Sequence, residues 1–94
     1  MIKEKYMEKI FTFKSSRKYY DKEFQDIKNN TVREINLGDD RFTELIAWME
    51  TGWKEGEIKI RIVDALYPSD NFERDIQDIS IWEDLMIITW KISP

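Results

Sequence analysis

The chain has 94 residues, which fits a single domain over 1–94 with a core of modest size. Four Trp, four Tyr and five Phe supply large side chains for burial, and the scarcity of Gly and Pro excludes a disordered chain. The absence of Cys and His excludes disulfides and thiolate metal sites, and the formal net charge of −4 argues against a non-specific nucleic-acid coat protein.

The distribution of charge and hydropathy along the chain narrows its setting. No apolar run is long enough to span a membrane, and the first residues lack the apolar region of a signal peptide. We therefore expect a cytoplasmic protein without membrane contact. Residues 1–36 carry a charge of +3 and residues 37–94 a charge of −7. The basic first third would suit an anionic ligand, although ordinary solvated faces explain the asymmetry equally well.

Hydrophobic periodicity and turn residues divide the chain into seven predicted elements. In chain order they are a strand over 9–14, a helix over 16–27, a strand over 31–36, a helix over 41–50, and strands over 57–64, 72–79 and 85–92. The order β-α-β-α-β-β-β predicts an α+β fold. Its mixed or antiparallel sheet is expected to be strongly curved or closed into a small barrel.

The first predicted helix follows a pair of serines that ends at Ser16, a suitable N-cap. Tyr20, Phe24 and Ile27 have the spacing of one helical face and are expected to be buried. The asparagine pair that begins at Asn29 is expected to break this helix, because Asn tolerates left-handed backbone.

The later elements differ in polarity. The second helix is preceded by a Gly-Asp-Asp turn with an N-cap and is expected to direct Phe42, Leu45, Ile46 and Met49 inward. Isoleucines alternate with charged residues over 57–64, which indicates one buried face and one wet face. Residues 72–79 are polar and predict an edge strand, whereas residues 85–92 are nearly all apolar and predict a covered strand.

A polar cluster lies at the junction of the first helix and the second strand. Thr31 and Arg33 should share one side of the strand because side chains alternate, and Lys28 precedes them in the turn. Together they can grip a phosphate or the polar edge of a base. Taken singly, each has a plainer explanation as a turn, strand or surface residue. The predicted ligand-binding residues are Lys28, Asn30, Thr31, Arg33, Trp53 and Trp82, the tryptophans lying near the cleft mouth.

The spacing Lys28-x-x-Thr31-x-Arg33 at a helix-to-strand junction resembles the signature of the ASCH domains of the PUA-like superfamily. The segments Asp39–Phe42 and Asp78–Asp84 are also similar to those of short ASCH-like proteins carried by bacteriophages. The order of helices and strands is similar over most of the chain, and a short motif of residues is specific to the family. It implies a small β-barrel with a cleft that binds RNA or modified nucleosides.

The resemblance also implies a possible reaction. Some small members of the family hydrolyse an acylated cytidine with a lysine, a threonine and a glutamate, and Lys28 and Thr31 match the first two. Glu83, which begins the turn into the last strand, is the candidate glutamate. Asp26 stands where a small residue is usual and Asn29 where Thr is common, and both departures put the reaction in doubt more than the fold.

Three functions from different classes remain open at this point. The first is a binding module for RNA, a nucleotide or a modified nucleoside. The second is a phage-encoded, anti-CRISPR-like inhibitor of a host defence system that binds a basic host protein through Asp75, Asp78, Glu83 and Asp84. The third is an amidohydrolase acting on an acylated nucleoside. No cofactor or metal is predicted. The protein is expected to be a monomer or a dimer formed through the edge strand 72–79.

Overall fold

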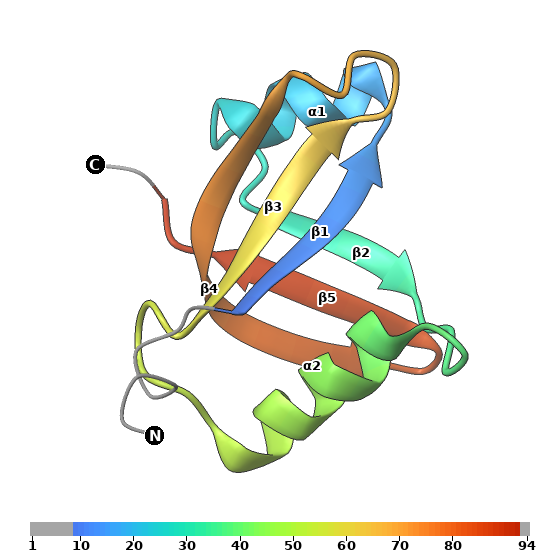
Figure 1. The fold of residues 1–94 in the computed structure, drawn as a ribbon, viewed down its shortest axis with the longest axis vertical. Coiled ribbons are helices and arrows are strands. Elements are labelled where there is room, and N and C mark those ends of the chain that lie inside the picture. Colours follow the sequence, from blue (N-terminus) through green and yellow to red (C-terminus); the bar gives the residue numbers. More distant parts are fainter. Residues whose placement is uncertain (1–8, 93–94) are drawn as a thin grey trace.

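A computed structural model describes residues 9–92, which form an α+β fold of five strands and two helices (Figure 1). The elements are β1 (Lys9–Ser15), α1 (Arg17–Phe24), β2 (Asn30–Glu34), α2 (Asp40–Thr51), β3 (Ile58–Asp64), β4 (Asn71–Trp82) and β5 (Leu85–Trp90). The seven predicted elements are thus confirmed in type and order. Their ends differ by a few residues, most at α1, β2 and β4.

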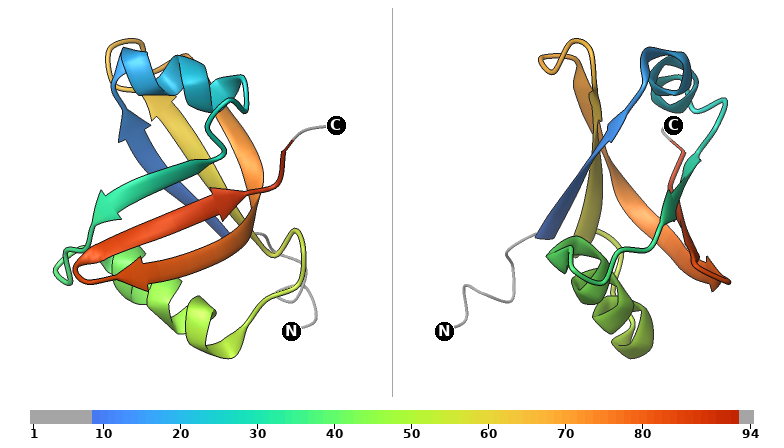
Figure 2. Two further views of the ribbon diagram at one scale, coloured as in Figure 1. Left: turned by 180° about the vertical axis from the view of Figure 1, so that it is seen from behind. Right: turned by 90° about the vertical axis from the view of Figure 1, so that its right-hand side faces the viewer.

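The five strands form one mixed sheet in the order β1-β3-β4-β5-β2. β1 and β3 are parallel, and the other neighbouring pairs are antiparallel. The long strand β4 pairs with β3 through its first half and with β5 through its second half, and the register shifts between Ile76 and Asp78. Such a bulge bends a strand, and Figure 2 shows that the sheet curls into a half-barrel around it.

The prediction of a polar edge strand over 72–79 is wrong, because β4 is the central strand of the sheet. Its polar residues reflect cross-strand ion pairs: Asp75 lies 3.0 Å from Lys59, and Glu73 pairs with Arg61 on β3. Phe72, Ile76 and Ile79 of β4 are buried and contribute to the core. β4 therefore offers no free edge for the predicted dimer, and the edges of the sheet are β1 and β2.

The core fills the concave side of the half-barrel. The alternation predicted for β3 is confirmed, since its three isoleucines are fully buried while Lys59 and Arg61 between them are partly exposed. From α2, Phe42 and Leu45 are buried, and Ile46, Met49 and Trp48 pack against the core while partly exposed. The buried apolar residues are Phe11, Phe13, Tyr20, Phe42, Leu45, Ile58, Ile60, Ile62, Phe72, Ile76, Ile79, Met86, Ile88 and Trp90.

The predicted buried face of α1 is only partly correct. Tyr20 is buried, but Phe24 is 51% exposed and Ile27 is 71% exposed. The helix ends at Phe24, and Asp26 has a left-handed backbone with φ of 59°, so the helical spacing does not continue to Ile27. The second buried residue of α1 is Glu23. The helix-breaking left-handed residue is therefore Asp26, not one of the asparagines.

Among residues 9–92, no helix is long and apolar enough to cross a membrane.

Candidate functional site

A cleft of about 400 Å³ lies between α1 and the two edge strands of the sheet. Curling of the sheet brings the β1 and β2 edges toward each other, and α1 connects them in sequence (Figure 1). The cleft is lined by Lys14, Ser15, Ser16, Tyr19, Glu23, Lys28, Thr31, Val32 and Arg33. It therefore contains the Lys28, Thr31 and Arg33 side chains that the sequence placed in one cluster.

Arg33 organises the floor of this cleft. Its Nε donates to Thr31 Oγ1 at 2.8 Å, which agrees with the prediction that both side chains share one side of β2. One terminal nitrogen donates to the Lys14 carbonyl at 2.7 Å and the other to Ser15 Oγ at 3.0 Å. Burial lowers the pKa of the Arg33 guanidinium, nearby Glu23 raises it, and the group remains a cation.

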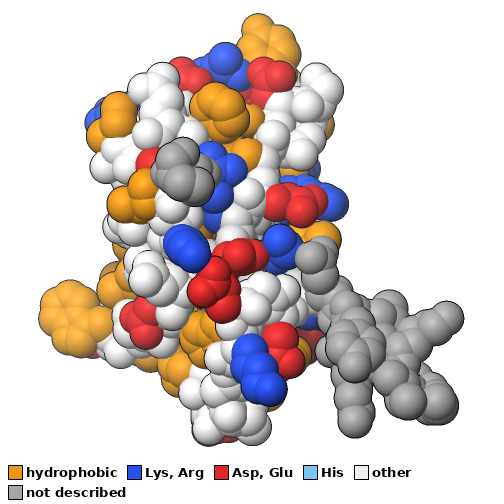
Figure 3. Space-filling model, turned by 90° about the vertical axis from the view of Figure 1, so that its left-hand side faces the viewer, with side chains coloured by type: hydrophobic (Ala, Val, Ile, Leu, Met, Phe, Trp, Pro, Cys, Tyr) orange, Lys and Arg blue, Asp and Glu red, His pale blue; other side chains and the backbone are white. Residues whose placement is uncertain are grey.

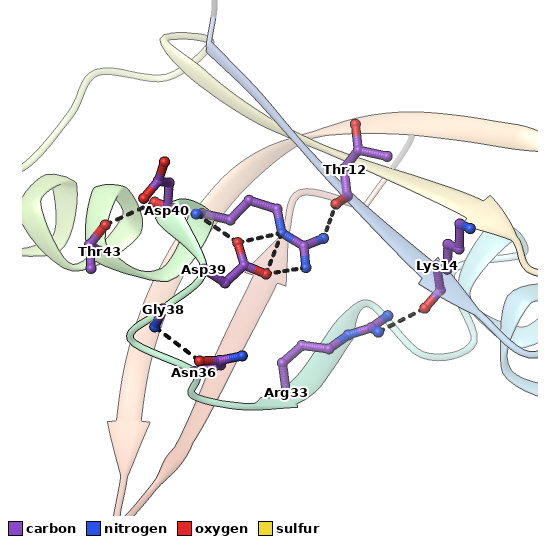
Figure 4. A network of polar contacts seen from close by, with 9 residues as sticks. Thr12, Lys14, Arg33, Asn36, Gly38, Asp39, Asp40 and Thr43 are labelled. Atoms are coloured by element: carbon purple, nitrogen blue, oxygen red, sulfur yellow. Dashed lines mark hydrogen bonds and ion pairs between the residues drawn. The ribbon is translucent and has the colours of Figure 1, made fainter.

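Arg33 and Arg41 together hold the β1 edge to the opposite side of the half-barrel. Figure 4 shows Arg33 donating to the Lys14 carbonyl, and Arg41 on α2 donates to the carbonyl of Thr12. Arg41 is fixed in turn by Asp39, the N-cap of α2, which accepts from the Arg41 backbone amide at 3.0 Å. Hydrogen bonds from Arg41 hold the pKa of Asp39 below its usual value. Arg33 therefore joins the β2 edge to the β1 edge through its side chain, and Arg41 joins the start of α2 to β1.

Lys28 is paired with Glu23, a carboxylate outside the predicted site. Its Nζ donates to Glu23 Oε2 at 3.2 Å and to the carbonyl of Asn30. Glu23 is 1% exposed, although it lies on a two-turn helix. One feature of the sequence indicates that Glu23 is buried: it lies three residues after Tyr20, so the two residues share the face of α1 that packs inward. Asn30, predicted to bind the ligand, does not line the cleft, and its backbone carbonyl accepts from Lys28.

The contacts of Thr31 do not activate it as a nucleophile. A nucleophilic hydroxyl needs a base that accepts its proton, whereas the Thr31 hydroxyl accepts from Arg33, and Lys28 contacts Glu23 and Asn30 instead. Glu83 does not line the cleft, since it lies in the β4–β5 turn with φ of 57°. The carboxylate of the cleft is Glu23.

The two predicted stacking tryptophans lie apart from this cleft. Trp53 lines a second cavity of about 410 Å³ and donates from Nε1 to the carbonyl of Ile76 at 3.0 Å. The other lining residues of that cavity are Gly52, Glu55, Asp75, Ile76, Gln77 and Lys91. Trp82 ends β4 and is 67% exposed, and it lines neither cavity. The aromatic residue beside Lys28 and Arg33 is Tyr19.

The acidic residues of the second hypothesis are distributed unevenly. Asp75 is partly buried and paired with Lys59, whereas Asp78, Glu83 and Asp84 are exposed. On the face drawn in Figure 3, acidic and basic side chains are interspersed and do not form a patch of one sign. Within residues 9–92, no group of three or more acidic side chains is arranged to hold a metal ion.

Three comparisons with known proteins bear on this site. No family model matches the chain, and searches of curated proteins and of solved structures return no significant match. The ASCH resemblance therefore stays a prediction, and function must be argued from the cleft itself.

Proposed function

We propose that this protein is a small binding module whose α1–β2 cleft takes a nucleotide, a modified nucleoside or RNA. The observation that carries the proposal is that two cationic side chains, Lys28 and Arg33, line one cleft in a chain of net charge −4. Against these two cations stands one carboxylate, Glu23. A concave site with excess positive charge attracts an anionic ligand and raises its local concentration.

The face that α1 turns to the cleft has the chemistry of a nucleotide site. Ser16, Tyr19 and Glu23 follow at spacings of three and four, so they form one row along the helix. Ser16 is the N-cap, and its side chain makes no capping hydrogen bond. The positive end of the helix dipole would favour a phosphate at that end. Tyr19, which is 48% exposed, offers a ring on which a base can stack.

Calorimetric titration at fixed salt tests the proposal, using a panel of nucleosides, nucleotides and short RNAs. We expect saturable binding by the wild type that is lost in Lys28→Ala. Lys22→Ala is the matched control, because Lys22 is exposed on α1 and does not line the cleft. Binding should also weaken as salt increases if phosphate is recognised. A thermal melt of each variant separates lost binding from lost folding. No binding to any panel member would refute the proposal.

A second candidate function is favoured by the β4–β5 turn. Trp82 is 67% exposed and is followed by the exposed acids Glu83 and Asp84. An exposed tryptophan beside carboxylates is suited to a basic protein partner, as expected of an inhibitor of a host defence system. Charge reversal at Asp78 and Asp84 would abolish this function and leave nucleotide binding in the cleft unchanged. The two candidates therefore predict opposite results for the same variants.

A further inference from the structure

Glu23 has one carboxylate oxygen that its own protein does not satisfy. Oε2 accepts from Lys28 at 3.2 Å, whereas Oε1 has no hydrogen-bond partner and exposes less than 1 Å². A buried acceptor without a partner is unfavourable, and such groups are rare in folded proteins. Because Glu23 lines the cleft, a bound ligand is a natural source of the missing donor.

The position of Glu23 also defines which part of a ligand it meets. Seven residues separate it from Ser16 along α1, which corresponds to about 10 Å of helix. A nucleotide lying along the helix with its phosphate near Ser16 would reach Glu23 with its base. A carboxylate repels phosphate but accepts hydrogen bonds from N–H groups. The Glu23 end of the cleft is therefore suited to a neutral, polar group.

Lys28 completes the complement to such a group. The ammonium has three donors, and its contacts with Glu23 and Asn30 use two of them. A free acceptor on Glu23 thus lies beside a donor on Lys28. The hydrogen-bonding edge of a nucleobase has the reciprocal pattern, an N–H next to a carbonyl oxygen or a ring nitrogen. Because Oε1 is covered, a ligand reaches it only when a neighbouring side chain shifts. Lys28, which contacts the other oxygen of the same carboxylate, is the neighbour that we expect to shift.

We propose that Glu23 Oε1 accepts an N–H from the Watson–Crick edge of a nucleobase, so that the inner end of the cleft recognises the base and the outer end the phosphate. This inference rests on the proposed function. It makes Glu23 the residue that selects bases carrying an N–H donor at this edge.

The test compares nucleotides with analogues from which the N–H donor has been removed. Uridine 5′-monophosphate is titrated against its 3-methyl analogue, and cytidine 5′-monophosphate against its N4,N4-dimethyl analogue. For whichever parent nucleotide binds the wild type more tightly, we expect its methylated analogue to bind with an affinity at least tenfold lower. In Glu23→Gln the ratio should fall toward one, because Lys28 donates to the single amide oxygen and the NH2 group, a donor, then takes the place of Oε1. Glu34→Gln, an exposed residue of β2 outside the cleft lining, is the matched control.

The outcomes separate this inference from the proposed function. If the nucleotides bind and methylation has no effect, the base-reading role of Glu23 is overturned while the binding module stands. If the methyl effect is as large in Glu23→Gln as in the wild type, the effect is steric and the inference is likewise overturned. If no nucleotide binds the wild type, both fail. Should Glu23→Gln not fold, titration of the wild type with the pyrimidin-2-one ribonucleotide, which lacks the 4-amino group of cytidine 5′-monophosphate and adds no bulk, decides whether that N–H is read: equal affinities would overturn the inference.

Discussion

Replacement of Arg33 by Lys keeps the positive charge of the cleft and removes the geometry that joins its two sides. The guanidinium reaches Thr31, Ser15 and the Lys14 carbonyl from three different nitrogens. A lysine carries all its donors on one nitrogen and cannot span these partners. The substitution therefore measures how much the Arg33 bridge between β2 and β1 contributes to stability.

The expected cost follows from the burial of the three acceptors. Thr31 and Ser15 are 3% and 6% exposed, so water does not readily replace a lost hydrogen bond to either hydroxyl. Each such bond contributes about 0.5–1.5 kcal/mol. The Lys14 carbonyl is at an exposed position and regains water, so its loss costs little. We expect Arg33→Lys to lower the free energy of unfolding by about 1–2 kcal/mol, because a lysine can replace at most part of these hydrogen bonds.

Urea unfolding followed by tryptophan fluorescence measures the change, and a thermal melt should show a decrease of roughly 4–8 °C per kcal/mol. Arg61→Lys is the control, because Arg61 forms a partly exposed cross-strand pair with Glu73 that should contribute about 0–1 kcal/mol. If the two variants lose the same stability, the Arg33 bridge does not hold the half-barrel together and our reasoning is refuted.

Three further predictions concern the fold. Leu45→Ala should lower the free energy of unfolding by about 2–5 kcal/mol, because Leu45 is fully buried; a loss below about 1 kcal/mol in urea would contradict its core position. Gly52→Ala should cost about 1–3 kcal/mol, since φ of 81° and ψ of 169° strain an L side chain although its Cβ would meet no atom within 4 Å; an unchanged unfolding midpoint would contradict this. Burial alone would raise the pKa of Asp64, but hydrogen bonds from Arg17, Leu66 and Tyr67 outweigh burial and hold it below its usual value. Its stabilisation is therefore complete above about pH 5 and is lost as pH falls through the folded-state pKa, so Asp64→Asn should weaken the acid dependence of urea midpoints between about pH 5 and pH 2. An identical pH profile in wild type and variant would exclude this role for Asp64.

Strong local patterns explain why so much of the fold follows from the sequence. The isoleucine alternation of β3 survives unchanged, because one face of a strand must be apolar wherever it covers a core. The Asp39 cap of α2 likewise depends on a short-range hydrogen bond between residues two apart in the chain. The proximity of Thr31 and Arg33 also follows from strand geometry alone.

The errors arise where long-range partners decide the outcome. The polarity of β4 indicated an edge, yet Lys59 and Arg61 on β3 neutralise its acids in the centre of the sheet. Nothing local to Ile27 shows that Asp26 will adopt a left-handed conformation and carry it away from the face of α1. Trp53 and Trp82 were grouped with the cleft by residue type, whereas the curl of the sheet places them elsewhere.

The sequence by itself determined the element order, the α+β class and the Lys28, Thr31 and Arg33 cluster, because each depends on periodicity or spacing within a few residues. Only the tertiary structure decided that β1 and β2 face each other across a half-barrel, since that follows from strand order and from the bend in β4. The same closure buries Glu23 beside Lys28 and leaves one of its oxygens without a partner. A carboxylate on a short polar helix acquires this environment through contacts distant in sequence, and the most specific feature of the cleft therefore lies outside what local patterns reveal.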